Sequence, residues 1–447
     1  MYILSKINSG NQRSVTIKKN ILWSFLIKGI SILTSFLLVP LTLGYVTAEI
    51  YGVWLTISSI LHWMTYMDVG FTLGLKNRLA EALAKNDYDR CRGLVSTTYF
   101  IMIVIFVPFS ILLIIVSPFI NWCNILNVSQ KYSETINITI QILSLFLSLQ
   151  MIVNVFVAVV AAHQKTALSQ LFQVIGQVCS LIIIACMSRF VEPSLVNLTF
   201  AYSLMPIVIV AFASLYFFWG PMKPIAPNYK SVDKSYIRDL WNLGVKFFII
   251  QVQMIVLYQS TNLLISHIDG PEAVTQYNIA YKLLNIISMV YMIILGPLWP
   301  AFTDAYTKGD YNWMKNIYRK MIYIFLALCA VIIVVTLSSP IIYKLWVGEK
   351  VSVPFILTLL VALYTALHSW DSLQVMLING IGAVKIQTFV VLVGIIIHIP
   401  LSLYLGRFIG ILGVIVSMSV INLIYSTIFT IQINKIIHKN AIGIWLD

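Results

Sequence analysis

Charged residues are scarce in this sequence. Only 10% of its 447 residues are Asp, Glu, Lys or Arg, whereas 60% are hydrophobic. A soluble domain carries about a quarter charged residues, so this composition excludes an ordinary soluble protein and predicts a polytopic membrane protein. Basic residues outnumber acidic ones, 29 to 16. In a membrane protein we interpret this excess as basic residues kept at the cytoplasmic face, and we expect no nucleic-acid partner.

The sequence also has few cysteines and lacks the motifs of common enzymes. Its five cysteines are scattered, without the spacing of a disulfide framework or a metal site. We find no glycine-rich nucleotide loop, no metal-ligand cluster and no ordered Ser/His/Asp set. The predicted outside loops are short, whereas membrane glycosyltransferases and polymerases usually carry a sizeable outside domain. We therefore expect neither enzymatic activity nor a resident cofactor or metal.

Twelve apolar stretches of bilayer length divide the chain. A helix needs about 20 residues to cross the hydrocarbon core, and a helix satisfies its own backbone groups in lipid. The predicted fold class is therefore an all-α polytopic membrane protein with about twelve transmembrane helices. The first stretch follows a basic N-terminus without a cleavage signature, so we interpret it as a retained span. The predicted spans are roughly 20–44, 49–67, 94–118, 135–160, 168–188, 194–219, 244–267, 277–301, 320–343, 353–378, 386–405 and 409–433.

The distribution of lysine and arginine predicts the orientation. If the N-terminus lies inside, 22 of the 29 basic residues fall in cytoplasmic segments and five in outside loops. The other two, Lys28 and Lys282, lie within spans. Because cytoplasmic loops retain basic residues, we expect both termini to be cytoplasmic.

The two halves of the chain resemble each other. Segments after the second and eighth spans share four residues at a constant offset of 223. This pattern predicts an internal duplication, with a central cavity between two six-helix bundles related by a pseudo-twofold axis along the membrane normal. We expect an N-terminal bundle at 1–219, a cytoplasmic linker at 220–243 and a C-terminal bundle at 244–447. The matched residues are Ala82, Lys85, Asp87 and Tyr88, and Ala305, Lys308, Asp310 and Tyr311.

Lys28 is the only charge in the first span. On a helix it shares one side with Ser24, Ser31 and Ser35. A charge at bilayer depth costs at least about 2.5–3.5 kcal/mol on insertion scales, so it usually faces the protein interior or a water-filled cavity. Alternatively, a lysine about two turns inside the helix reaches the headgroups with its flexible stem.

Polar residues recur on one side of several other spans. Taken singly, each can form an interhelical hydrogen bond, worth about 0.6–2 kcal/mol. Taken together, they predict the lining of a wide hydrophilic cavity. The candidate lining residues are Ser24, Ser31, Asn137, Gln141, Gln173, Gln177, Gln253 and Asn285.

The sign of the charges within the spans indicates what such a cavity would bind. Lys28 and Lys282 are cations, and cations lining a cavity suit an anionic group such as a diphosphate. Asp371 is the one acid clearly within a span, three residues after His368. These two residues form a candidate pair for ion coupling, and a structural role is the alternative, in which Asp371 pairs with His368 or with a lysine.

Several short motifs give the chain a family resemblance. They are YGVW at 51–54, DVGF at 68–71, GLKNRLAE at 74–81, GVKFF at 244–248 and PLWPAFTDAY at 297–306. Together with the twelve spans, they resemble the polysaccharide transporter family, whose members include Wzx-type O-antigen flippases of a MATE-like superfamily. The resemblance runs from about residue 15 to the end.

This resemblance implies a transport function. The protein would move an undecaprenyl-diphosphate-linked oligosaccharide, such as an O-antigen unit for lipopolysaccharide, between leaflets of the bacterial inner membrane. Alternating access would be the mechanism, coupled to H⁺ or Na⁺, and a polymerase or ligase of the same pathway would be a partner. The alternatives are a MATE-type drug exporter, disfavoured because the first span has no acid, and a membrane glycosyltransferase or polymerase. A lipid II flippase would usually add two further helices.

Overall fold

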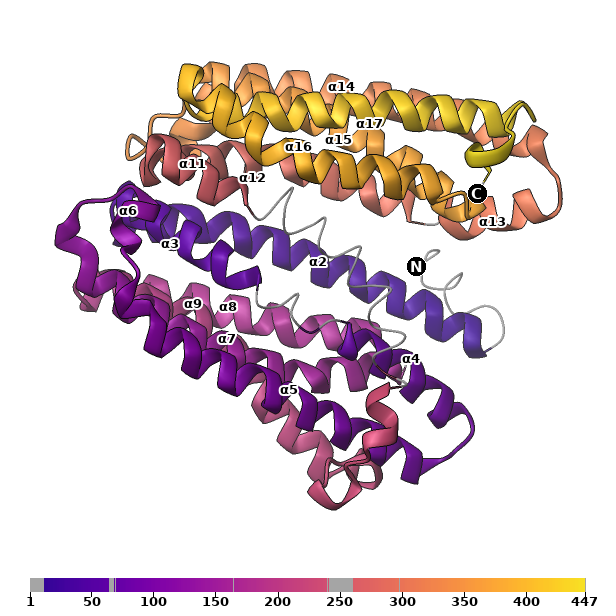
Figure 1. Cartoon of the computed structure of the whole chain (residues 1–447), viewed down its shortest axis with the longest axis horizontal. Helices are drawn as coiled ribbons and strands as arrows, with labels where there is room; N and C mark the ends of the chain where they lie inside the picture. The colour runs from indigo at the N-terminus through magenta and orange to yellow at the C-terminus, as the bar shows by residue number, and fades with distance from the viewer. Residues whose placement is uncertain are drawn as a thin grey trace, which may run out of the picture. The chain divides into compact units, whose positions relative to one another are not determined.

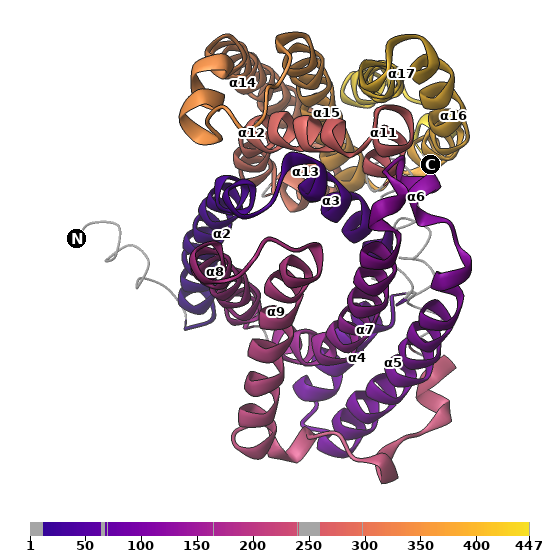
Figure 2. The same ribbon diagram turned by 90° about the vertical axis from the view of Figure 1, so that its left-hand side faces the viewer.

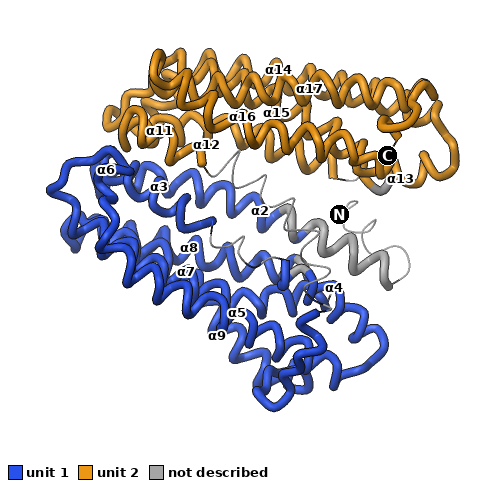
Figure 3. The backbone as a smooth tube through the Cα atoms, viewed as in Figure 1, with its two compact units in different colours: residues 1–255 blue, residues 256–447 orange. Residues whose placement is uncertain are grey.

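The computed structural model describes residues 12–63, 68, 70–163, 165–238, 240, 260–296 and 298–446, and in this part of the chain the regular secondary structure is helical (Figure 1). The chain divides into two compact units, residues 1–255 and 256–447 (Figure 3). The predicted limits of 1–219, 220–243 and 244–447 stay a prediction.

Unit 1 contains seven longer helices and several short ones within its described residues. The helix α8 packs against both α2 and α9, and α7 packs against α5, α4 and α9 (Figure 2). The helices are α2 (Gln12–Tyr45), α3 (Ala48–His62), α4 (Phe71–Ala84), α5 (Tyr88–Val116), η2 (Ser117–Phe119), α6 (Trp122–Leu126), η3 (Gln130–Tyr132), α7 (Ser133–Ala162), α8 (Thr166–Phe190), α9 (Leu195–Trp219), η4 (Lys223–Ile225) and η5 (Tyr229–Ser231).

Unit 2 repeats this packing pattern. The helix α15 packs against α13, α14 and α17, just as α7 packs against α4, α5 and α9 in unit 1. The helix α17 in turn packs against α16, just as α9 packs against α8. The helices are α11 (Thr261–Asp269), α12 (Pro271–Leu295), α13 (Leu298–Thr307), α14 (Tyr311–Trp346), α15 (Phe355–Ile381), α16 (Lys385–Ile409), α17 (Ile411–Ile437) and η7 (Gly443–Trp445).

Ten helices in the described part of the chain are long and apolar enough to cross a bilayer. They correspond to ten of the twelve predicted spans. The predicted second span is represented by α3, which ends at His62, and residues 64–67 lie outside the described residues. The predicted seventh span, 244–267, is described only from residue 260 onward, as the start of α11.

The duplicated motif forms the same turn in both units. After α4 the chain reverses through Asn86, with φ of 56°, and after α13 it reverses through Gly309, with φ of 68°. Both residues adopt the left-handed conformation that Gly and Asn tolerate best. Asn86 and Gly309, which are 223 residues apart, thus adopt the same left-handed conformation at equivalent turns.

The residues around the two turns also have matching partners. Asp87 N donates to Ala82 O over 3.1 Å, and Asp310 N donates to Ala305 O over 2.9 Å. Each aspartate then caps the following helix, because its side chain accepts a hydrogen bond from the backbone N–H three residues later. An internal duplication explains this agreement of sequence, turn and cap.

The connection after α9 packs on the end of α5. Arg92 Nε donates to Pro224 O over 3.0 Å, Asn228 N donates to Ser96 Oγ over 2.9 Å, and Asp233 N donates to Thr97 Oγ1 over 3.1 Å. The ring of Tyr236 packs so close to Gly93 that a Cβ there would lie 2.6 Å from a ring carbon. The described residues of this predicted linker are therefore held against unit 1.

Candidate functional site

In unit 1 a polar seam runs beside the contact between α2 and α8. The apolar part of the contact joins Ile27 to Ala167 and Val174. Beside it, Ser31 Oγ donates to Gln177 Oε1 over 2.9 Å. Ser31 and Gln177 were both predicted cavity residues, and the structure brings them together. Their bond is of the interhelical kind that was the alternative to a lining role.

Lys28 and Gln173 extend this seam by one turn. Lys28 precedes Ser31 by three residues and Gln173 precedes Gln177 by four, so each lies about one helical turn away from the bonded pair. Both side chains are exposed, whereas Ser31 and Gln177 are half-buried. The seam therefore has an exposed cation on α2 and an exposed amide on α8, each one turn from the bonded Ser31 hydroxyl and Gln177 amide oxygen.

The exposed apolar face of α2 lies away from Lys28. Its large side chains recur at helical spacing and are 44–59% exposed, which on a membrane-spanning helix suits contact with lipid. At about 100° per residue, Lys28 projects roughly 180° from the middle of this stripe. This direction favours an interior or aqueous setting over a lysine that reaches the headgroups from the lipid side. The stripe consists of Trp23, Leu26, Ile30, Leu33 and Leu37.

The other predicted residues of unit 1 have separate settings. Asn137 Oδ1 accepts a hydrogen bond from Ser117 Oγ over 3.1 Å, which joins α7 to η2. Gln141 is half-buried one turn further along α7. Ser24 lies in α2, with its side chain outside the described part, and Gln253 lies outside the described residues altogether.

In unit 2 Lys282 and Asn285 lie on one face of α12 with Asn278. Both predicted residues are half-buried. Asn278 Nδ2 donates to Asn262 Oδ1 of α11 over 2.9 Å, and Lys282 follows Asn278 by one turn. This face combines a cation with amide groups, as the α2–α8 seam does in unit 1.

Asp371 lies in α15 among the buried side chains of unit 2 and is only 5% exposed. Ser426 Oγ of α17 donates to its Oδ1 over 2.6 Å. Its Oδ2 is buried, and within the described residues no group donates a hydrogen bond to it. Burying a carboxylate is costly unless its oxygens are satisfied, so this oxygen is a candidate acceptor for a proton or a cation.

His368 has its own partners on the same helix and on α17. Its ring stacks on that of Tyr364, with centroids 5.7 Å apart, and the Asn422 side chain forms a hydrogen bond with it. The two predicted residues therefore lie on neighbouring turns of α15 but have different partners. Asp371 accepts a hydrogen bond from Ser426, whereas His368 contacts Tyr364 and Asn422. Within the described residues, Asp371 therefore forms no hydrogen bond with His368.

Sequence reasoning missed two other buried hydrogen bonds of α15. Ser288 of α12 and Ser369 of α15 share a hydrogen bond of 3.0 Å. Gln374 Nε2 donates to Tyr318 OH of α14 over 3.2 Å, and Gln374 is fully buried. The spacing of Asp371 and Gln374, three residues apart in an apolar span, was a usable signal. The hydroxyl partners on other helices had no such signal.

The amino-acid sequence of the chain is similar to those of known protein families. Residues 17–306, more than half of the chain, match the family described as polysaccharide biosynthesis protein, and residues 248–404 match the MatE family. A protein of Yersinia pseudotuberculosis whose name refers to O-antigen export is 21% identical over 80% of this chain and 81% of its own length. A protein of Salmonella typhimurium whose name refers to O-antigen transport is 23% identical over 41% of this chain and 44% of its own length.

Solved structures of similar fold are multidrug resistance transporters of the MATE family. One, in an inward-facing conformation, aligns with a TM-score of 0.79 at 12% identity over 94% of this chain and 98% of its own. Another, in an outward-facing conformation, has a TM-score of 0.63 at 14% identity over 94% and 96%. The predicted MATE-like helical fold is confirmed. The chain belongs to the polysaccharide biosynthesis protein family, the Wzx-type polysaccharide transporters that its motifs resemble.

Proposed function

We propose that this protein is a flippase for undecaprenyl-diphosphate-linked oligosaccharides. It carries units of O-antigen or a similar surface polysaccharide from the cytoplasmic to the periplasmic leaflet of the bacterial inner membrane. The observation that carries this proposal is the family match over residues 17–306. The names of the two relatives, which refer to O-antigen export and transport, support the same substrate class.

The polar seam of α2 and α8 supports an anionic headgroup as the group that is bound. Lys28 is exposed and lies opposite the apolar stripe of α2, and Gln173, one turn before Gln177 on α8, is also exposed. A lysine binds phosphate as a point charge, and an amide can donate to a phosphate or to a sugar hydroxyl. Lys28 therefore contacts the diphosphate in this proposal, Lys282 is a second candidate, and the lipid tail stays in the bilayer.

Transport proceeds by alternating access and is coupled to H⁺ or Na⁺. Asp371 is the candidate coupling residue, because one of its buried carboxylate oxygens lacks a hydrogen-bond donor among the described residues. Its other oxygen, bound to Ser426, ties the acid to α17. Gain or loss of a cation at Asp371 would thus change the contact between α15 and α17.

The localisation and partners follow from the same proposal. Both termini are cytoplasmic, the substrate is the lipid-linked glycan, and a polymerase or ligase of the same pathway receives it. The protein performs no covalent chemistry. Drug export is the second candidate function, because the MatE family also matches part of the chain, but α2 carries only basic charges and no acid to attract an organic cation.

The direct test uses purified protein in vesicles with its lipid-linked substrate. Lys28→Ala is expected to lower the initial flipping rate about tenfold or more, because a hydrogen bond to a charged group is worth about 1.5–3 kcal/mol. Lys28→Arg keeps the charge and should retain part of the rate. Lys350→Ala, which removes an exposed lysine elsewhere, is the matched control. A native rate in Lys28→Ala would contradict the role of Lys28, and a native protein that flips no substrate would contradict the function.

A further inference from the structure

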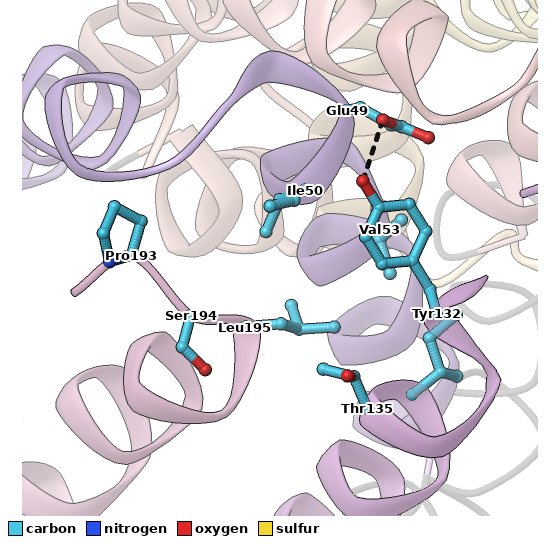
Figure 4. A pocket seen from close by; sticks show the side chains of 9 residues that line it. Glu49, Ile50, Val53, Tyr132, Thr135, Pro193, Ser194 and Leu195 are labelled. Carbon is cyan, nitrogen blue, oxygen red and sulfur yellow. Dashed lines mark hydrogen bonds between the residues drawn. The ribbon is translucent and has the colours of Figure 1, made fainter. Parts of the chain in front are cut away.

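A cavity of about 180 Å³ opens at one end of unit 1, between α3, α7 and α9 (Figure 4). Glu49 and Tyr132 lie on one side of it, and Pro193 and Ser194 lie on the opposite side. Apolar side chains of the three helices complete its wall. They are Ile50, Val53, Ile136 and Leu195.

The polar groups of this cavity are only partly paired. Tyr132 OH donates to Glu49 Oε2 over 3.3 Å. In the described part of the chain, no group is bound to the other oxygen of Glu49, and the Thr135 hydroxyl is also without a partner. Ser194 accepts a hydrogen bond from Val196 N and keeps its hydroxyl hydrogen to donate. The cavity thus presents one carboxylate oxygen and two hydroxyls above an apolar wall.

This combination matches a sugar ring better than an ion. A hard cation collects six or more oxygen ligands, whereas Glu49 is the single carboxylate among the residues that line the cavity. A pyranose ring has an apolar C–H surface for the aliphatic wall and neighbouring hydroxyls for the carboxylate. Hydrogen bonds from hydroxyls to a carboxylate are charge-assisted and therefore strong. The volume accommodates one monosaccharide.

We propose that this cavity is a carbohydrate subsite that holds one sugar of the transported oligosaccharide, with Glu49 accepting the hydrogen bonds of two of its hydroxyls. The inference rests on the proposed function for its substrate class. The lining residues come from the N-terminal ends of α3, α7 and α9 and from residues just before α7 and α9. The distribution of basic residues assigns these helix ends to the outer face. The subsite therefore contacts the glycan after it has crossed the membrane.

Binding of lipid-free glycan tests the subsite separately from flipping. The probe is a single repeat unit cut from the surface polysaccharide of the producing strain, without lipid or diphosphate. Saturation-transfer NMR of the full-length protein in nanodiscs measures its binding, and Glu49→Gln is expected to lower the saturation signal at least fivefold. Thr135→Val, which removes a hydroxyl at nearly constant volume, should lower it to a smaller extent. Glu192→Gln is the matched control, an exposed acid close to the cavity but outside its lining.

Each result decides between the two claims. A signal that falls in Glu49→Gln but not in Glu192→Gln supports the subsite. An equal signal in native protein and Glu49→Gln overturns it, and so does binding of an organic cation without binding of the sugar. If the native protein flips lipid-linked substrate but gives no signal with the free repeat unit, the subsite is wrong and the flippase function stands. If it binds the repeat unit but flips nothing, the subsite stands and the flippase function is wrong.

Discussion

Replacing Asp371 by asparagine separates a coupling role from a structural one. Asparagine has nearly the same shape and keeps an oxygen that can accept the 2.6 Å hydrogen bond from Ser426 Oγ. It removes the charge, and with it the capacity of the second, unpartnered oxygen to take up a proton or a cation. The substitution therefore keeps an acceptor for the Ser426 hydroxyl and removes the titratable group, which holds position 371 in a neutral state.

The structure sets the expected effect on stability. Asp371 is 5% exposed, and burying an ion costs several kcal/mol. One hydrogen bond to a charged group returns about 1.5–3 kcal/mol. The new amide would be a buried donor without a partner, which costs about 1–3 kcal/mol. Because these terms nearly offset each other, we expect the variant to be as stable as the native protein or slightly more stable, while transport no longer responds to an ion gradient.

The assay combines flipping in vesicles under an imposed H⁺ or Na⁺ gradient with thermal unfolding of the purified protein. Ser369→Ala is the matched control, because it removes another buried hydrogen bond of α15, the one to Ser288. That control should lose about 0.5–1.5 kcal/mol of stability and keep its gradient response. An Asp371→Asn protein with a native gradient response would refute the coupling role. One that fails to fold would show that the acid is structural.

Two further predictions concern the turns and the connection after α9. Asp87→Ala and Asp310→Ala each remove a helix cap, so both should lower the free energy of unfolding by about 1 kcal/mol in thermal unfolding of the purified protein; a clear difference between them would contradict the equivalence of the two turns. Gly93→Ala places a Cβ 2.6 Å from the ring of Tyr236, so we expect faster proteolysis of the segment 223–236 than in the native protein, and Tyr236→Ala in the same chain should restore the native space around residue 93. Unchanged proteolysis in Gly93→Ala would show that this contact does not hold the segment.

Local sequence was enough to predict the fold class and the family. Hydropathy is a property of each stretch alone, and a bilayer requires each apolar stretch that crosses it to form a helix. The spans can therefore be predicted without knowledge of their neighbours. The duplicated turns were also predictable, because Asn86 and Gly309 and the aspartates that follow them form the turn and its cap within a few residues. These features depend on short separations along the chain.

The tertiary structure alone decided the partner of each polar side chain. Ser31 and Gln177 were predicted to line one cavity, but their own hydrogen bond across 146 residues could not be read from either span. One predicted alternative for Asp371 was a pair with His368 or a lysine, and neither span gave any sign of the hydrogen bond from Ser426, 55 residues away. Glu49 and Tyr132 attracted no attention in the sequence, since the cavity between them forms only when three helix ends meet.

The partners could not be predicted because the sequence determines the spacing of residues along a helix but not the rotation of the helix about its axis. Helical spacing determines which residues of one span share a face, so the sequence by itself placed Lys28 with Ser31 and Lys282 with Asn285. The direction in which that face points depends on how the whole helix packs, which is a sum over its neighbours. The contact of Ile27 with Ala167 and Val174 fixed the rotation of α2, and it left Lys28 exposed.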